Sequence, residues 1–262
     1  MHRRAMIQVC TCAVLWACAA GCNGQLTPQA RQLLNRASAS LSAGDYGATL
    51  ADMDRFLHEH GSSRGVGRAH YLRGKAKLGL NDRKGARKDL AEALDRSRER
   101  DVRINAELAL GDLAFEEGHM ATAGQMYRDV ISEGQTGKPP LDHARYRLGC
   151  VLQRRGKWLA ADLQFNRVVE YFPGTEIARR GARRLHARGW TVQAGAFSDK
   201  SRADALTRRL KAGGLPSDVT PLLSEGRPLF IVVVGRYSNH EQAGEVLGSV
   251  KKHQADAFVT VR

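Results

Sequence analysis

The sequence predicts two folded parts: an all-α solenoid of paired helices, then a small α/β domain with the order βαββαβ, the split βαβ arrangement. Small residues recur every 37 or 38 positions within residues 29–189, which indicates a helical repeat. Strand and helix patterns alternate within the last 73 residues, 190–262. A basic and then apolar leader sets residues 1–21 apart from both parts.

The leader has the composition of a secretory signal. Met1 to Arg4 is basic, and Ala5 to Ala20 is apolar but shorter than a membrane-spanning helix. Small residues precede Cys22, and the sequence Ala-Ala-Gly-Cys here resembles a bacterial lipobox, although Ala19 stands where leucine is usual. The resemblance implies cleavage before Cys22 and acylation of both its thiol and its new amine, which gives stable membrane anchoring.

Two alternatives stay open for this segment. Cys18 is a second candidate for lipidation, although Trp16 is bulky for a small-residue position, and an ordinary signal with a chance cysteine also fits. Residues 22–28 are expected to form a short lipidated tether, and Asn23 in place of Asp favours the outer membrane by analogy with enterobacteria. We therefore expect a periplasm-facing, lipid-anchored protein.

The composition points to an anionic partner and away from disulfides. The formal net charge is +14, which suits nucleic acid, anionic lipid or an acidic wall polymer, unless the arginines merely solvate helix surfaces. Four of the five cysteines lie in the first 22 residues, so a disulfide framework in the folded part is excluded. The fifth, Cys150, is predicted to be a small buried apolar residue.

The helical repeat is read from three sets of positions that keep the same phase. The first helix of each pair carries a small residue: Ala37, Gly74, Gly111 and Gly149. The turn between the helices carries a loop residue: Gly44, Asn81, Gly118 and Gly156. The second helix carries another small residue: Thr49, Ala86, Ala123 and Ala161. Small residues on facing helices let the backbones approach, and stacked units share one core. The pattern resembles the tetratricopeptide (TPR) repeat, and the resemblance implies a protein partner. The first unit departs most, with Arg36 where Leu110 and Leu148 stand in later units.

A capping helix is predicted over residues 175–188, because a periodic segment follows the last unit and precedes the first strand. It is rich in arginine: Arg179, Arg180, Arg183, Arg184 and Arg188. These side chains could bind phosphate, lipid head groups or nucleic acid, or form a solvated helix face.

The last 73 residues give the elements of the α/β domain in order. Residues 190–197 read as a strand. Ala203, Leu206 and Leu210 then recur at helical spacing, and Gly213-Gly214 stops this helix. Residues 217–223 and 229–234 read as a hairpin through Glu225-Gly226. Ser238 and Glu241 form a predicted capping box before a second helix, whose buried face carries Ala243, Val246, Leu247 and Val250. Residues 258–261 close the sheet, which should have helices on one face and leave the other open.

This stretch resembles a SPOR domain. The resemblance rests on the opening Val-Gln-Ala-Gly-Ala-Phe from Val192, on Gly214-Leu215-Pro216 and on residues 232–237, where Arg236 and Tyr237 replace the family's usual Pro-Phe. It implies binding of bacterial peptidoglycan, with preference for glycan strands stripped of their stem peptides, which are abundant at division septa. It also implies an amide at Gln193 on the glycan-binding face, where it can donate to and accept from sugar groups.

The remaining members of the predicted glycan site come from strand alternation and from the resemblance. Alternation places Val192, Ala194 and Ala196 towards the helices, and Gln193, Gly195 and Phe197 on the open face. The resemblance nevertheless puts the position of Ala196 in the glycan site. The complete set is Gln193, Ala196, Phe197, Leu229, Ile231 and Val259.

No pattern for catalysis, metal binding or a cofactor is present. His58-Glu59-His60 lacks the HExxH spacing, and histidines two residues apart point away from each other on a helix. The βαββαβ order is shared with RNA-binding RRM domains, but the aromatic RNP1 pattern is missing, so no nucleic acid is expected as a partner. We therefore expect a non-enzymatic protein of division or wall remodelling that binds peptidoglycan and recruits a protein partner. The alternative is an assembly scaffold whose second domain contacts protein instead.

Overall fold

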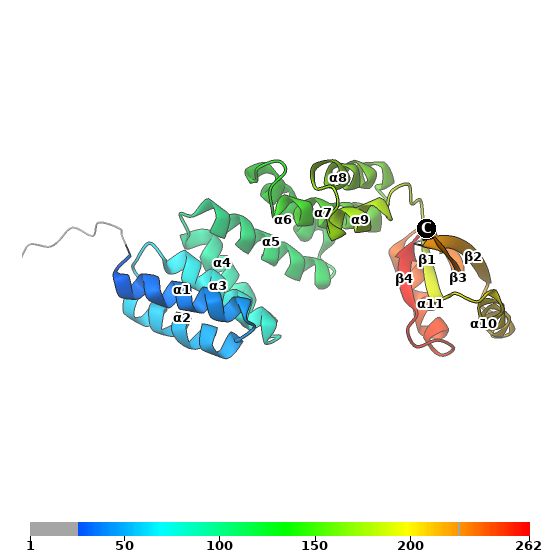
Figure 1. Ribbon diagram of the computed structural model, residues 1–262, viewed down its shortest axis with the longest axis horizontal. Coiled ribbons are helices and arrows are strands. Elements are labelled where there is room, and N and C mark those ends of the chain that lie inside the picture. The colour runs from blue at the N-terminus through cyan, green and yellow to red at the C-terminus, as the bar shows by residue number, and fades with distance from the viewer. Residues whose placement is uncertain (1–25, 225) are drawn as a thin grey trace, which may run out of the picture.

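The computed structural model describes residues 26–224 and 226–262 (Figure 1). Cys22 and Cys18 lie outside the described residues, so their lipidation stays a prediction. Within the described part, nine helices pack side by side, and we call them the array. A four-stranded sheet with two helices follows the array. None of the described helices has both the length and the apolar character needed to cross a bilayer.

The first eight helices are antiparallel pairs, and the ninth caps the last pair. Their bounds are α1 Pro28–Ser42, α2 Tyr46–His60, α3 Val66–Gly79, α4 Arg83–Arg96, α5 Arg100–Glu116, α6 Met120–Glu133, α7 Leu141–Arg154, α8 Trp158–Tyr171 and α9 Glu176–Ala182. Hydrophobic clusters are shared between neighbouring pairs, such as the one joining Ile104 of α5, Tyr127 of α6 and Leu148 of α7. The array therefore has a continuous core, as stacked repeats require.

The three phased positions have the packing predicted for them. The residues of the turn set, Gly44, Asn81, Gly118 and Gly156, all have positive φ, between 62° and 83°. A Cβ added at Gly149 would lie 2.5 Å from the Phe165 ring of α8, so only glycine fits there. The small residues of the second helices are fully buried: Thr49, Ala86, Ala123 and Ala161. The sequence period therefore comes from helix contact distance and turn geometry.

Helix α9 is shorter than predicted. It ends at Ala182 rather than continuing to residue 188. Two side chains of the array bind the backbone beyond it: Gln153 Nε2 donates to Arg184 O at 3.0 Å, and His186 N donates to Asp162 Oδ1 at 3.0 Å. These bonds, with His186 at φ 62°, turn the chain off the helix axis towards the sheet.

The second part, here called the sheet domain, has the predicted βαββαβ order. Its elements are β1 Trp190–Phe197, α10 Lys200–Ala212, β2 Ser217–Ser224, β3 Arg227–Tyr237, α11 His240–Lys251 and β4 Phe258–Val261. The strand order is β2-β3-β1-β4 and every neighbouring pair is antiparallel. Val192, Val232 and Val234 point from the sheet into a core with Leu206 and Leu210 of α10. Both helices contribute to this core, so one face of the sheet is covered.

The second helix begins one residue later than the capping box predicts. Asn239 is the N-cap of α11, and its Oδ1 accepts a hydrogen bond from Gln242 N at 2.9 Å. The Ser238 hydroxyl instead lies 3.1 Å from Gln242 Oε1. Asn and Ser are nearly equal N-caps, so composition alone does not separate these two positions.

The array and the sheet domain are joined by more than the connecting chain. Trp158 of α8 packs against the core of the sheet domain, and its ring centroid lies 6.0 Å from that of Trp190. Arg188 Nη2 lies 2.9 Å from Asp162 Oδ2, and Arg188 N donates to Arg262 O at 2.8 Å. These contacts hold the end of the array against the sheet domain at β1 and β4, where the chain passes from one part to the other (Figure 1).

Candidate functional site

The open face of the sheet is built around Gln193 of β1. Its register partners are Val233 of β3 and Phe258 of β4, so these three residues form a row across the sheet. Thr191 lies two residues earlier on the same face, and its hydroxyl donates to Val234 O at 3.1 Å and to Gly235 O at 2.9 Å. No side-chain hydrogen bond within the described residues engages the Gln193 amide, which leaves both its donor and acceptor groups for a ligand.

A β-bulge changes the direction of the side chains after Gln193. The register passes from Gln193↔Val233 to Gly195↔Val232, so β1 has one extra residue at Ala194. Phe197 consequently packs against the helix-covered core, and the guanidinium of Arg202 on α10 lies 5.7 Å from its ring centroid. The prediction that Phe197 belongs to the open face is therefore wrong.

The same bulge moves Ala196 to the opposite face from the one that alternation gives it. Ala196 is exposed and pairs with Ile231, which lies on the open face with Val233. Simple alternation predicts that Ala196 faces the helices, and this is wrong. The family resemblance places Ala196 on the open face, and the structure agrees. Leu229 pairs with Leu222 and is half-buried, two residues before Ile231.

Strand β4 contributes different residues from the one predicted. Val259 pairs with Val192 and packs against the helix-covered core, so it does not lie on the open face where the glycan site is predicted. Phe258 and Thr260 are the β4 side chains that line the open face, and Phe258 is 50% exposed. Val259 and Val261 are apolar at alternate positions, which is the signal that places Phe258 and Thr260 outwards.

The open face is one wall of a cleft of about 770 Å³, a size typical of small-ligand sites. Its other wall comes from the end of the array and consists of Tyr146 of α7 with three arginines: Arg180, Arg183 and Arg184. We call these three arginines the arginine wall. The sheet supplies one amide with hydroxyl and apolar groups, and Arg262 after β4 adds a fourth arginine: Thr191, Gln193, Thr220, Leu222, Leu223, Ile231, Val233, Phe258, Thr260, Val261 and Arg262. The sequence indicates the arginines but not that they face the sheet.

The arginine wall makes this cleft positive. No acidic side chain is among the residues that line it. The Arg180 guanidinium lies 4.9 Å from the Tyr146 ring centroid, and Arg184 Nε donates to Gln153 Oε1 at 2.9 Å. Arg183 Nη2 is 3.4 Å from Glu176 Oε1, an exposed and weak pair. Burial raises the pKa of the Tyr146 phenol, which therefore stays neutral at physiological pH. The cleft can bind an anionic, hydroxyl-rich ligand without any chemical step.

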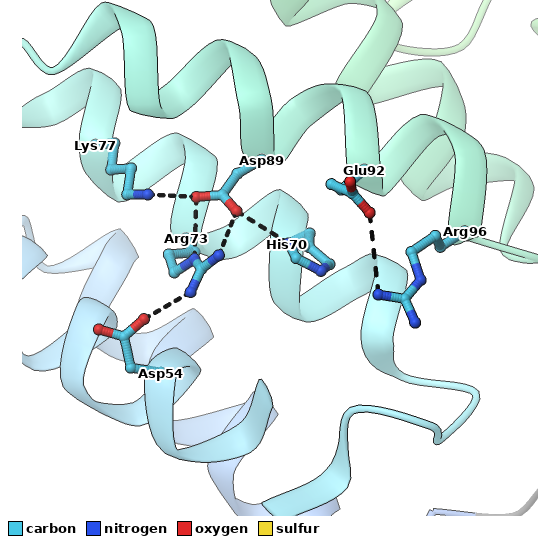
Figure 2. Close-up of polar contacts among 7 residues, drawn as sticks. All are labelled: Asp54, His70, Arg73, Lys77, Asp89, Glu92 and Arg96. Atoms are coloured by element: carbon cyan, nitrogen blue, oxygen red, sulfur yellow. Dashed lines mark hydrogen bonds and ion pairs between the residues drawn. The ribbon is translucent and has the colours of Figure 1, made fainter. Parts of the chain in front are cut away.

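A second polar cluster lies inside the array, where Asp89 of α4 faces three side chains of α3 (Figure 2). Asp89 lies 2.9 Å from His70 Nδ1, 2.6 Å from Arg73 Nη2 and 2.7 Å from Lys77 Nζ. Burial opposes ionisation of Asp89, but these three hydrogen-bond partners outweigh it and hold its pKa well below the usual range. Arg73 also donates to Asp54 of α2 at 2.7 Å, so the cluster joins three consecutive helices.

This cluster repeats in part, and it shows that Arg36 of the first unit has the same role as Arg73 of the second. Arg36 and Asp52 lie 37 residues before Arg73 and Asp89, and Arg36 Nε donates to Asp52 Oδ2 at 2.6 Å. In the third unit the same two positions hold Leu110 and Met126, which pack in one apolar cluster. The repeat thus accepts an ion pair or an apolar pair at this contact, so Arg36 is a structural residue.

The other residues singled out in the sequence have structural surroundings. Cys150 is a buried free thiol, as predicted. His58 is exposed, whereas the His60 ring packs against Phe56 with centroids 5.5 Å apart and its Nε2 is buried. Within residues 26–224 and 226–262, no group of three or more potential ligand side chains could hold a metal ion.

Comparison with known proteins defines the class of each part. Residues 187–260 match the family model of the SPOR domain, and residues 143–175 match that of the tetratricopeptide repeat. None of the curated proteins matches the chain. A tetratricopeptide repeat protein from Parabacteroides merdae is 14% identical, with 71% of this chain and 66% of that protein covered and a TM-score of 0.51.

Two further solved structures have lower TM-scores. MamA is 20% identical over 54% of this chain and 77% of its own, with a TM-score of 0.45. YrrB, described as a TPR protein with an unusual peptide-binding site, is 18% identical over 87% of each chain, with a TM-score of 0.46.

The chain therefore combines a helical-repeat array with a small α/β domain, and each belongs to a class of binding domain. In particular, residues 143–175 are a tetratricopeptide repeat, of a family that mediates protein contacts, and residues 187–260 are a SPOR domain, of a family that binds peptidoglycan.

Proposed function

We propose that this protein is a lipid-anchored, non-enzymatic component of the bacterial cell envelope. In this proposal Cys22 carries the lipid, the chain faces the periplasm from the outer membrane, and the SPOR domain binds denuded glycan strands of the septal wall. The array recruits a protein partner of the division or wall-remodelling machinery. The observation that carries the proposal is the open sheet face with the unengaged amide of Gln193 at its centre, backed by the SPOR match.

The array has a surface suited to a protein partner. Leu159 and Leu163 of α8 lie one helical turn apart, and they are 76% and 55% exposed. Large apolar side chains that are adjacent and exposed favour contact with another protein. This observation supports recruitment through the last repeat, on a helix whose Trp158 packs against the sheet domain.

The wall-binding proposal is tested with the two-part chain, residues 26–262, and purified peptide-stripped glycan strands. Gln193→Ala should weaken binding roughly two- to tenfold, because sugar groups lose one hydrogen-bond partner in a partly desolvated contact. Its melting temperature should barely change, since the amide has no side-chain partner within the described residues. Gln242→Ala, an exposed change on α11 away from the open face, is the control.

Three results separate the possibilities. Binding by the unaltered chain and by Gln242→Ala, with weaker binding by Gln193→Ala, supports the site. Equal binding by all three removes Gln193 from it. Absence of binding by the unaltered chain contradicts wall binding and favours the scaffold alternative, in which the SPOR fold contacts protein. Anchoring is tested separately with the full-length chain. Cys22→Ala should abolish the incorporation of labelled palmitate.

A further inference from the structure

We propose that the glycan site of this protein extends beyond the SPOR domain onto the arginine wall, which binds carboxylates on the glycan. The ligand group we infer is the free lactyl carboxylate that a wall sugar exposes once its stem peptide has been removed. This inference rests on the proposed function, and it adds a source of specificity that lies outside the sheet domain.

The geometry places the arginines over the open face. The same cleft is lined by the arginine wall and by Gln193 and Ile231. The arginines belong to the end of the array, whereas Gln193 and Ile231 belong to the sheet domain. A strand of sugars lying on the sheet would therefore have one side against Thr and Gln side chains and its other side against guanidinium groups. The SPOR match begins at residue 187, after all three arginines.

The position of the arginine wall is fixed by the array. Gln153 of α7 is fully buried and binds Arg184 twice, through its amide nitrogen to Arg184 O at 3.0 Å and through its amide oxygen to Arg184 Nε at 2.9 Å. Asp162 of α8 binds His186 N and the Arg188 guanidinium. These contacts hold the segment after α9, which carries Arg183 and Arg184, at the edge of the cleft. Arg180 of α9 itself lies against the Tyr146 ring of α7, so the guanidinium groups are positioned before a ligand arrives.

The charges in the cleft lack an acidic counterpart of their own. Arg180 and Arg184 have no ion pair with an acidic side chain within the described residues, and Arg183 has only the exposed 3.4 Å pair with Glu176. A planar guanidinium binds a carboxylate through two parallel hydrogen bonds, which are stronger than bonds between neutral groups. An anionic ligand would therefore gain charge-assisted bonds here, and the protein would lose little existing pairing.

The chemistry of the ligand fits both walls. A stem peptide is joined to the wall sugar through an amide on a lactyl group, so hydrolysis of that amide leaves one carboxylate on each such sugar. The same sugars carry hydroxyl and acetamido groups for Gln193 and the threonines, and apolar ring faces for Phe258 and Tyr146. An intact peptide would replace the carboxylate by a neutral amide and bring bulk into the cleft.

The test compares two forms of the same peptide-stripped strands: one with free carboxylates, and one with the carboxylates converted to methylamides. The unaltered chain, residues 26–262, should bind the free acid roughly five- to tenfold more tightly, with a smaller preference at high salt. The double variant Arg180→Gln, Arg183→Gln should lose most of this preference, because it removes two of the four arginines that line the cleft. Arg184 is left unchanged because it bonds to Gln153. The charge-matched control is Arg179→Gln with Arg208→Gln, neither of which lines the cleft.

The outcomes distinguish this inference from the proposed function. Equal binding of both glycan forms by the unaltered chain overturns carboxylate recognition and leaves wall binding intact. A preference that is undiminished in Arg180→Gln, Arg183→Gln, or that is lost in the Arg179 and Arg208 control, overturns the role of the arginine wall. Polyglutamate that competes as well as the free-acid strands would show general anion binding and overturn the inference. Failure to bind either glycan form would overturn the proposed function itself.

Discussion

The polar cluster around Asp89 is expected to be an obligatory contact of the array, and replacing Asp89 by methionine tests this. Asp89 is 1% exposed and receives hydrogen bonds from Arg73 Nε at 3.0 Å, Arg73 Nη2 at 2.6 Å and Lys77 Nζ at 2.7 Å (Figure 2). Removing one partner of a buried ion pair costs about 3–5 kcal/mol. The side chains of Arg73 and Lys77 are 22% and 24% exposed, so they can regain some water, and we expect the lower value, about 3 kcal/mol.

The third unit supplies the compensating change. It has Leu110 and Met126 at the positions of Arg73 and Asp89, so Arg73→Leu combined with Asp89→Met transplants its apolar pair. Arg73→Leu alone should cost about 1–2 kcal/mol, because Asp89 keeps His70 and Lys77. The double variant should cost at least about 1 kcal/mol less than the sum of the single changes, since no buried carboxylate is left facing a leucine.

Urea unfolding followed by far-UV circular dichroism, which the helices of the array dominate, measures these differences. The methionine variant should also melt about 6–12 °C lower, given roughly 2–4 °C per kcal/mol for a chain of this size. Two results would refute the reasoning. One is a stability loss in the double variant that equals the sum of the two single losses within about 0.5 kcal/mol. The other is a stability loss below about 1 kcal/mol for Asp89→Met.

Acid provides an independent check on the same contact. The depressed pKa of Asp89 means that its contribution is fully present above the unfolded value, near 3.9, and is lost as the pH falls through the lower folded value. The stability difference between the unaltered chain and Asp89→Met should therefore be constant between about pH 5 and pH 8, and should shrink below about pH 4.

Two further changes test the array at single positions. Burial, with Asp129 and Glu133 nearby, raises the pKa of Glu107 to about 7, so folding favours its protonated form and its ionisation destabilises the fold as the pH rises from about 4.5 through 7. Glu107→Gln should then stabilise the fold by roughly 1–3 kcal/mol at pH 8, after allowance for partial exposure, and should have little effect at pH 4. Melting temperatures at the two pH values measure this, and a pH-independent effect would contradict it. Gly149→Leu should lower the stability by roughly 1–3 kcal/mol, because the larger side chain overpacks against Phe165. Gly248→Ala should be neutral or stabilising, because an added Cβ there meets open space. Similar melting temperatures for the two variants would count against close packing at Gly149.

The repeat was predictable because its signals are local. The turn set from Gly44 to Gly156 needs left-handed backbone in each unit, and the small residues of the second helices are buried wherever two helices touch. Both requirements act on single residues at a fixed spacing, so the sequence displays them directly. The strands of the sheet domain were predictable for the same reason, since alternation and turn residues are local patterns.

The composition of the site was only partly predictable, because it depends on register and on tertiary contact. One extra residue at Ala194 exchanges the faces of Ala196 and Phe197, and nothing in the sequence fixes the bulge. A bulge in β1 is compatible with glycine at 195, where an added Cβ would lie 2.8 Å from the Phe197 ring. The position of Arg180 depends on its contact with the Tyr146 ring, and that of Arg184 on its bonds to Gln153, and both partners lie about 30 residues earlier in the chain.

The contacts between the array and the sheet domain also determine how mechanical force would travel through the molecule. In a chain that is anchored and holds a wall strand as proposed above, tension between the strand and the anchor would enter the array through residues 183–189. There Asp162 holds Arg188 and Gln153 holds Arg184, while Trp158 lies against Trp190. These groups would share the load in parallel, so the junction should resist extension until several contacts yield together. Growth or constriction of the wall could thereby strain the last repeat, which also presents Leu159 and Leu163 to solvent.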